Sequence, residues 1–255
     1  MSVKRTSSGI ILTENPAIIK TSPAIPLGGL YTDLISYFNF DSGLNDIHAS
    51  NNLTAFGSPS TVAGKISNAI RTDGIDDYLL CEDISKFDMG TGDLSVSIWV
   101  RWIDQFFNDV GLIGKKGSPA GGLGWTIDTY KIGTPYNGGI IAYVDFPGGV
   151  NKGVAASPNI LLDHLWHHIV LTFKRDGFMK IYNDNILASS VDISAHAVEN
   201  IISLQPMSIG CLYIAAANYF GNNDYDEIGI WKKELSVVEI SQLWNGGAGL
   251  PYASF

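Results

Sequence analysis

The chain is dominated by short apolar segments separated by turn-forming steps, and this pattern restricts its possible folds more than any other feature. In the clearest segment, residues 94–102, two classes of side chain alternate with the two-residue period of a strand. The apolar face comprises Leu94, Val96, Ile98, Val100 and Trp102. The opposite face comprises Ser95, Ser97, Trp99 and Arg101.

Further strands are predicted along most of the chain. They span residues 34–40, 77–81, 110–115, 123–128, 139–145, 166–174, 178–183, 207–211 and 225–231. Gly-Asp, Gly-Gly, Pro-Gly and Asp-Gly steps lie between them and favour tight turns. Strands this numerous, at such short spacing, predict an all-β fold built as a two-sheet antiparallel sandwich.

One short helix is expected near the C-terminus. Ser236 and Glu239 have the spacing of a capping box, and Gly246 suits the left-handed position that follows a helix. One face of this helix would carry Val237, Ile240, Leu243 and Trp244. The helix is expected to cover one end of the sandwich.

The first 29 residues differ in character from residues 30–255. They hold three basic residues and one acidic residue, whereas the whole chain has a net charge of −9. Their prolines forbid a helix and favour extended chain; these are Pro16, Pro23 and Pro26. The alternative is a flexible tail, but the segment is apolar for a solvated one. We therefore predict an extended assembly arm over 1–29, with Ile11, Ile18 and Ile25 as anchors, and a sandwich over 30–255.

Charge and composition exclude several classes of protein. An acidic chain lacks the basic footprint that nucleic-acid binding requires. No window of about 18 apolar residues is present, so no membrane insertion is expected. The first apolar run is broken by Glu14 and Pro16 before it reaches the length of a secretory signal. Cys81 and Cys211 are expected to be buried free thiols rather than a disulfide.

Six motifs follow one another over roughly residues 30–250. They are RTDGIDDYLL (71–80), DLSVSIWVRW (93–102), GLIGKKG (111–117), WHHIVLTFKRDGFMKIYNDN (166–185), MSIG (207–210) and DYDEIGIWKKELSVVEISQLWNGG (224–247). In this order the series resembles the concanavalin A-like, laminin-G-like jelly-roll family, found in lectin-like modules and phage virion proteins. The resemblance implies two curved sheets of six or seven strands. It also implies ligands in the concave groove or at the rim loops.

Catalysis is not expected. Retaining glycanases of this family carry a Glu-x-Asp-x-x-Glu strand motif, which the sequence lacks. Asp224, Asp226 and Glu227 are the nearest group, but in a strand Glu227 would oppose the other two. Adjacent His167 and His168 would likewise point to opposite sides and could not share a metal ion. We therefore predict no catalytic residues.

A structural calcium ion is an expectation from the resemblance. Many members of the fold hold one where the first strand meets the last, and the matching ligands here would be Asp41 and Asp226. The alternative interpretation is that Asp41 begins a turn and Asp226 caps a loop. No other cofactor is expected.

Carbohydrate binding is suggested by loops that combine aromatic platforms with planar polar side chains. From the residues of these loops we choose four as candidate ligand-binding residues, namely Trp102, Asp109, Tyr136 and Asn218. The alternative is that most of these aromatic residues are core or inter-subunit contacts.

The predicted function is that of a non-enzymatic structural or adhesive virion protein, a phage capsid decoration or a tail or fibre subunit, with a glycan-binding domain. By analogy with such proteins, the arm would bind other copies of the chain or other virion proteins, and the sandwich would bind cell-surface glycans. The localisation would then be the virion. The alternative is a soluble bacterial carbohydrate-binding or adhesion module, extracellular or at the cell surface, with no virion role.

Overall fold

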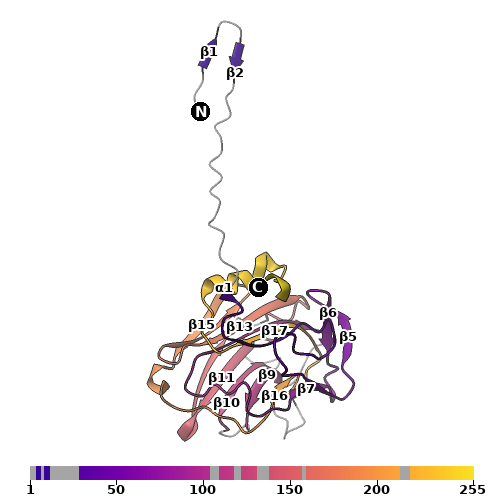
Figure 1. Cartoon of the computed structure of the whole chain (residues 1–255), viewed down its shortest axis with the longest axis vertical. Helices are drawn as coiled ribbons and strands as arrows, with labels where there is room; N and C mark the ends of the chain where they lie inside the picture. Colours follow the sequence, from indigo (N-terminus) through magenta and orange to yellow (C-terminus); the bar gives the residue numbers. More distant parts are fainter. Residues whose placement is uncertain are drawn as a thin grey trace.

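The fold was analysed in a computed structural model of the chain. It describes residues 4–6, 9–11, 29–103, 109–117, 122–130, 138–156, 159–212 and 219–255. Two antiparallel sheets face each other and make up the sandwich (Figure 1). This confirms the predicted fold class.

The first sheet has seven strands in the order β12-β11-β10-β9-β16-β7-β4. Their bounds are β4 Thr54–Phe56, β7 Tyr78–Cys81, β9 Val110–Lys116, β10 Gly124–Thr129, β11 Ile140–Phe146, β12 Val150–Ala155 and β16 Met207–Ile209. Every pairing in this sheet is antiparallel.

The second sheet has eight strands in the order β15-β14-β13-β8-β17-β6-β5, and β3 pairs with part of β17. Their bounds are β3 Leu34–Phe38, β5 Ser60–Ala63, β6 Asn68–Arg71, β8 Leu94–Trp102, β13 Trp166–Phe173, β14 Phe178–Asn183, β15 Ile186–Asp192 and β17 Asn223–Trp231. The first sheet thus has the expected number of strands, and the second exceeds it through β3.

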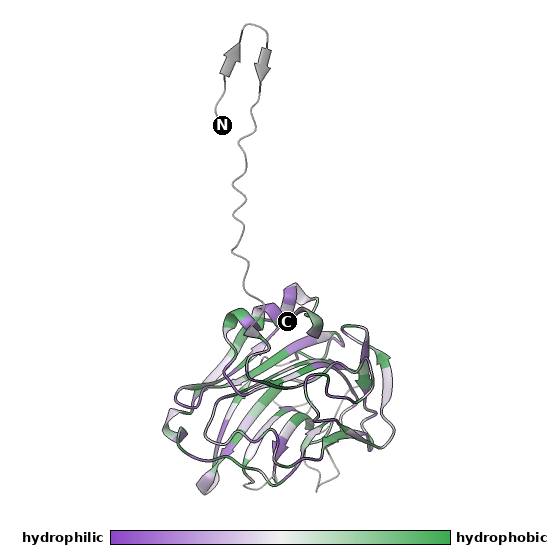
Figure 2. Ribbon diagram, in the orientation of Figure 1, coloured by the Kyte–Doolittle hydropathy of each residue, from purple (hydrophilic) through white to green (hydrophobic). Residues whose placement is uncertain are grey.

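The core lies between the sheets because alternate residues of each strand turn inward. Ile98 and Leu171 of the eight-stranded sheet belong to the same buried cluster as Ile127 and Val144 of the seven-stranded sheet. The predicted inner face of β8 is confirmed, since all five of its residues are in this cluster. Figure 2 shows hydrophobic and hydrophilic residues alternating along the strands. Burial of this apolar surface is the main force that holds the sheets together.

The predicted C-terminal helix is present as α1, Val237–Trp244, but it packs on the outer face of the eight-stranded sheet rather than over one end of the sandwich (Figure 1). Trp244 stacks on Trp99 of β8, with ring centroids 5.2 Å apart. Ile240 and Leu243 are buried as expected, but Val237 is 64% exposed, which corrects its assignment to the buried face. Val237 occupies the first turn of the helix, where the sheet no longer reaches it.

The capping box of α1 is confirmed, because Ser236 Oγ accepts a hydrogen bond from Glu239 N and Glu239 Oε2 accepts one from Ser236 N. We expect Ser236→Ala to lower the free energy of unfolding by about 1 kcal/mol, since orphan backbone donors lose their partner. Urea denaturation monitored by tryptophan fluorescence would measure the change. Ser241→Ala, on the exposed side of the same helix, is the control and should change stability by less than about 0.5 kcal/mol.

The described residues of the N-terminal arm form a two-stranded hairpin. Strand β1, Lys4–Thr6, pairs antiparallel with β2, Gly9–Ile11. Ile11 is therefore in extended backbone, whereas the other two predicted anchors, Ile18 and Ile25, lie outside the described residues. Among the described residues, no helix has the length and apolar character that crossing a membrane requires. Cys81 and Cys211 are buried free thiols, as predicted.

Candidate functional site

A pocket of about 380 Å³ lies on the outer face of the seven-stranded sheet. It combines three tyrosines with charged side chains, and its principal lining residues are Asp109, Lys116, Asp128, Tyr130, Tyr143 and Tyr219. Strands β9, β10 and β11 supply its floor, and Tyr219 comes from the segment between β16 and β17. The pocket therefore draws together residues that are more than 100 positions apart in the sequence.

Strand alternation explains why polar groups reach this face. Trp125 and Ile127 of β10 point into the core, so Thr126 and Asp128 between them point outward. Gly114 of β9 lies opposite Thr126, where an added Cβ would come within 2.8 Å of Thr126 Oγ1. The missing side chain at position 114 thus leaves room for the polar groups of β10.

Two polar contacts organise the charges of the pocket. Lys116 Nζ forms an ion pair with Asp145 on β11, and Thr126 Oγ1 donates a hydrogen bond to Asp128 Oδ1. Asp128 is 5% exposed, and this burial raises its pKa to about 8 despite the opposing effect of the Thr126 hydrogen bond. At neutral pH Asp128 is therefore a neutral carboxyl group that can donate as well as accept hydrogen bonds.

Tyr143 forms one wall of the pocket in a fixed orientation. Its hydroxyl lies 2.8 Å from the hydroxyl of Tyr130, and its ring covers Gly153 of β12. An added Cβ at Gly153 would approach the Tyr143 ring to 2.8 Å. The Tyr143 ring position thus depends on a glycine on the neighbouring strand.

The raised pKa of Asp128 predicts that stability falls as pH rises. The folded state retains the Asp128 proton up to about pH 8, whereas an aspartate in the unfolded chain releases its proton near pH 3.8. The folded form therefore binds more protons in this interval, and the free energy of unfolding decreases with rising pH. We expect Asp128→Asn to reduce the loss of melting temperature between about pH 5 and about pH 9. The exposed control Asp176→Asn should retain the full loss.

The four predicted ligand-binding residues have different positions. Asp109 lines the pocket, as the prediction of a ligand-binding residue requires. Trp102 is 1% exposed and belongs to the core, so its assignment as a sugar platform is corrected; its place on the inward face of β8 keeps its ring between the sheets. Tyr136 and Asn218 lie outside the described residues. Lys116 and Asp128 also line the pocket but were not among the predicted residues, because a strand sequence alone does not show which outer polar residues will face a pocket.

Asp41 and Asp226, the predicted calcium ligands, both hold the turn that joins β5 to β6. Asp226 Oδ2 accepts a hydrogen bond from Ile66 N at 2.9 Å, and Asp41 Oδ1 accepts one from Asn68 N at 3.0 Å. Asp226 is fully buried, and this burial raises its pKa to about 8. The carboxylates thus act as turn acceptors, which is the alternative interpretation of these residues, and they lie at the same turn, as the prediction of a shared site requires.

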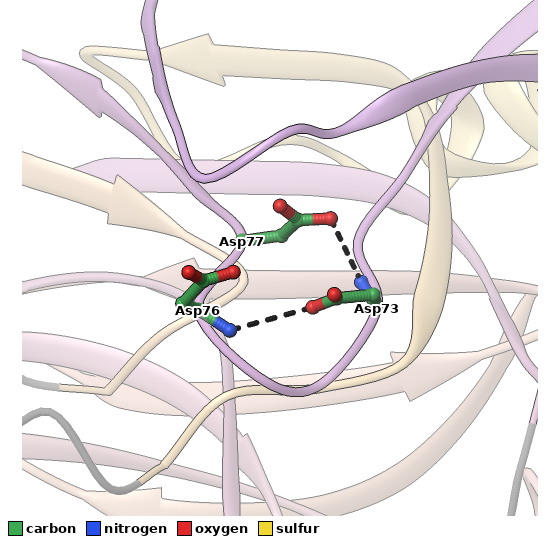
Figure 3. A group of neighbouring side chains, drawn as sticks. All are labelled: Asp73, Asp76 and Asp77. Carbon is green, nitrogen blue, oxygen red and sulfur yellow. Dashed lines mark hydrogen bonds between the residues drawn. The ribbon is translucent and has the colours of Figure 1, made fainter.

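Among the described residues, one group of three carboxylates has the close spacing of a metal site, formed by Asp73, Asp76 and Asp77 (Figure 3). Its carboxylates serve the backbone of the loop that precedes β7. Asp77 Oδ2 accepts a hydrogen bond from Asp73 N, and Asp73 Oδ1 accepts one from Ile75 N. Asp77 Oδ1 also accepts a hydrogen bond from Ser58 N. The cluster shapes the loop.

His167 and His168 point to opposite sides, as predicted. His168 is buried beneath α1, where its Nε2 lies 2.8 Å from Ser97 Oγ, and burial lowers its pKa to about 3. The two ring nitrogens of His167 lie 2.7 Å from Asp184 and 3.0 Å from Asp163. The two side chains therefore have different partners and are not placed to bind one metal ion together.

A family model for the concanavalin A-like lectin/glucanases superfamily matches residues 73–241. The chain belongs to this superfamily. The match covers the strands that form the pocket, β9 to β12, all of β17 and the larger part of α1. No curated protein matches the sequence.

Among solved structures, the superfamily fold is shared with toxin binding domains. The binding domain of Paraclostridial Mosquitocidal Protein 1 matches with a TM-score of 0.70 and 16% identity over 86% of this chain and 53% of that one. The receptor binding domain of botulinum neurotoxin C/D mosaic serotype matches with a TM-score of 0.66 and 17% identity over 84% and 51%. This chain spans about half the length of these structures, and at such identity the likeness shows the fold alone.

Proposed function

We propose that this superfamily member is a non-enzymatic glycan-binding domain whose ligand lies in the pocket on the seven-stranded sheet. The observation that carries the proposal is the combination, in one pocket, of tyrosine rings with planar carboxyl groups and a lysine. Aromatic rings stack against the apolar faces of sugars, and the carboxyl and ammonium groups bind hydroxyls. Cell entry of botulinum neurotoxin type C, a structural neighbour, is dependent upon interaction with two ganglioside molecules, and this supports the choice of a glycan as the ligand.

Glycan-array screening of the whole chain, followed by titration of the best ligand, tests the proposal. We expect Tyr143→Ala to weaken binding by about tenfold or more, since it removes a ring worth about 1–3 kcal/mol in a buried contact. Gly153→Val should act in the same direction by displacing the Tyr143 ring. Tyr31→Ala, at a 40% exposed tyrosine outside the pocket, is the matched control and should bind normally. Hydrolysis of any array glycan would contradict the non-enzymatic assignment.

The finer proposal is a virion role, with residues 1–29 as an arm that binds other copies of the chain or other virion proteins. It is supported by the apolar, proline-rich composition of the arm and by the pairing of β1 with β2, which leaves outer strand edges for further hydrogen bonding. Light scattering of the full chain and of a chain beginning at Leu30 would test it. The same number of copies per assembly for the two chains would contradict the proposal and favour an extracellular adhesion module.

A structural calcium ion at Asp41 and Asp226 completes the proposal. Its support is the close gathering of carboxyl groups: Asp226 is fully buried, Glu227 beside it is 3% exposed, and Asp41 holds the same turn as Asp226. Burial raises the pKa of Asp226 to about 8 and that of Glu227 to about 7, and a divalent cation held by their oxygens would stabilise the deprotonated forms. Thermal melting at pH 8 with calcium and with a chelator would test this, and we expect calcium to raise the melting temperature of the parent but not of Asp226→Asn. Equal melting temperatures for the parent in both buffers would leave the hydrogen-bonding role alone.

A further inference from the structure

The strongest unassigned feature is a row of four side chains across the outer face of the eight-stranded sheet. Arg71 of β6 pairs with Asp224 of β17, Asp224 pairs with Arg101 of β8, and Arg101 pairs with Trp166 of β13. Because neighbouring strands are about 4.8 Å apart, the row extends over about 14 Å. The row is separate from the pocket, which lies on the seven-stranded sheet.

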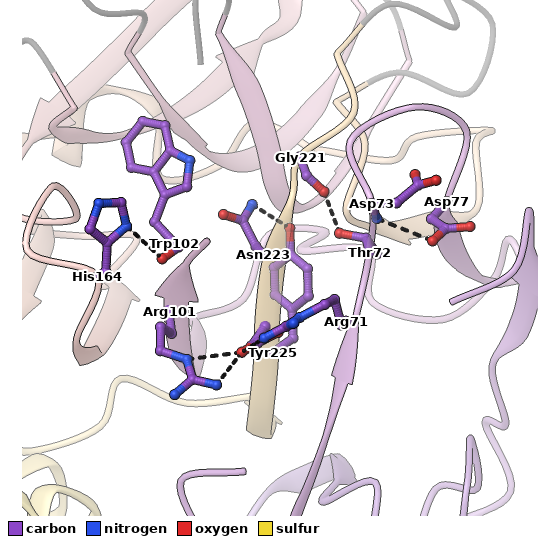
Figure 4. Close-up of polar contacts among 11 residues, drawn as sticks. Arg71, Thr72, Asp73, Asp77, Arg101, Trp102, His164, Gly221, Asn223 and Tyr225 are labelled. Atoms are coloured by element: carbon purple, nitrogen blue, oxygen red, sulfur yellow. Dashed lines mark hydrogen bonds and ion pairs between the residues drawn. The ribbon is translucent and has the colours of Figure 1, made fainter. Parts of the chain in front are cut away.

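Asp224 holds both arginines, and Figure 4 shows the side chains of Arg71 and Arg101 approaching each other. Asp224 Oδ1 accepts a hydrogen bond from Arg71 Nε at 2.6 Å, and its Oδ2 accepts bonds from Arg71 Nη2 at 2.9 Å and from Arg101 Nη2 at 2.5 Å. Asp224 itself is fully buried, whereas the side chains of Arg71 and Arg101 are 34% and 28% exposed. The carboxylate therefore fixes one edge of each guanidinium and leaves the rest of each group at the surface.

The row has an excess positive charge, because its two guanidinium groups share a single carboxylate. One buried carboxylate balances one guanidinium, and within the described part of the chain neither arginine forms an ion pair with any other acidic residue. A guanidinium has five N–H donors in a planar fork that matches a carboxylate. Each arginine uses its Nε and Nη2 on Asp224, so the Nη1 donors remain for a ligand. This surplus charge stands out on a chain with a net charge of −9.

Trp166 gives the row an apolar end, and Leu165 beside it adds further apolar surface. The guanidinium of Arg101 lies 4.9 Å from the centre of the Trp166 ring, a cation–π contact that fixes the plane of the guanidinium. Leu165, next in the chain, is 62% exposed. Farther along the strands, the same sheet face is covered by α1 through the stack of Trp244 on Trp99. The row is thus the part of this face that α1 leaves open.

We propose that Arg71 and Arg101 form a second binding site, which takes the carboxylate of an acidic sugar such as a sialic or uronic acid residue. The two guanidiniums would bind the carboxylate oxygens, and Trp166 acts as a positioning residue for Arg101. Asp224 already orders both long arginine side chains, so binding of the ligand costs less conformational entropy. This site is independent of the pocket in the proposed function.

The test compares lactose, sialyllactose and sulfated lactose presented on a sensor surface to the whole chain. We expect binding of sialyllactose over lactose, and we expect Arg71→Gln and Arg101→Gln each to weaken it by about tenfold, the range for a lost charge-assisted hydrogen bond. Each variant retains one arginine on Asp224, so the fold should persist, and a melting curve of each verifies this. Raising the salt concentration should weaken sialyllactose binding in the parent.

Lys174→Gln is the matched control, because it removes one surface positive charge outside the row and should retain binding. Equal losses in Lys174→Gln and Arg71→Gln would overturn the proposal, since they would reflect only net charge. Equal affinity for lactose and sialyllactose, or a preference for sulfated lactose, would also overturn it. Tyr143→Ala should retain sialyllactose binding at the row. A wrong proposal for the pocket can therefore be distinguished from a wrong proposal for the row.

Discussion

Replacing Trp231 by alanine is expected to lower the free energy of unfolding by about 3–5 kcal/mol, the range for truncating a buried aromatic ring. Trp231 is fully buried in the second apolar cluster, between the eight-stranded sheet and the C-terminal segment. Its Nε1 donates a hydrogen bond to Leu30 O at 2.7 Å, which ties the start of the sandwich to β17. The truncation removes the ring and the hydrogen bond together, and it weakens the apolar cluster that also contains Ile240 and Leu243 of α1.

Urea denaturation would measure this loss, with Trp231→Phe as the graded control. The phenylalanine keeps most of the ring contacts but loses the bond to Leu30 O, so we expect a smaller loss of about 1–2 kcal/mol. Gly229→Ala should be costly for the converse reason, because its Cβ would lie 2.2 Å from the Trp231 ring. A loss of less than about 1 kcal/mol in Trp231→Ala would contradict the assigned packing.

Replacing Asp224 by alanine is the second change with a large expected effect. It leaves Arg71 and Arg101 on one patch without their shared carboxylate, and breaking a buried ion pair in this way costs about 3–5 kcal/mol. The two arginines are partly exposed and can turn to solvent, so we expect a loss toward the lower end of this range. The loss should be smaller in the triple variant that also carries Arg71→Gln and Arg101→Gln, because no unpaired guanidinium remains.

Asp176→Ala is the matched control for the loss of a carboxylate. Asp176 pairs with Lys174 at 3.3 Å, but its side chain is 73% exposed, so its removal should change stability by less than about 1 kcal/mol. The same urea denaturation applies to all of these variants. Similar losses for Asp224→Ala and Asp176→Ala would show that burial does not strengthen the Asp224 contacts.

The central strands could be predicted from the sequence because both of their faces, or one whole face, are buried. The bounds of β8 and β14 match the prediction, and β13 is buried along most of both faces. The sandwich strands missed were β4, β5, β6, β12 and β15. Four of these, β4, β5, β12 and β15, lie at the edges of the sheets. An edge strand such as β15 is largely exposed, so its sequence carries no apolar alternation to detect.

The candidate sites depended on tertiary structure to different degrees. The period-two rule placed Trp102 on the inner face of β8, and its selection as a ligand-binding residue conflicted with that placement. The structure agrees with the strand rule. Asp109 lines the pocket, and its role as a ligand-binding residue stays a prediction; Lys116 and Asp128 join it there only when β9 and β10 pair in register. Arg71, Asp224 and Arg101 come from three strands whose adjacency the sequence does not show.

The sequence alone determined the sandwich class, the inward face of β8 and the capped helix near the C-terminus. Each follows from interactions between residues close in the chain, namely strand alternation, turn chemistry and helix capping. Strand order, the pocket and the arginine row were decided by tertiary structure. Those features join residues from distant segments, such as Arg71 and Asp224, and the pairing of their strands depends on packing the whole core.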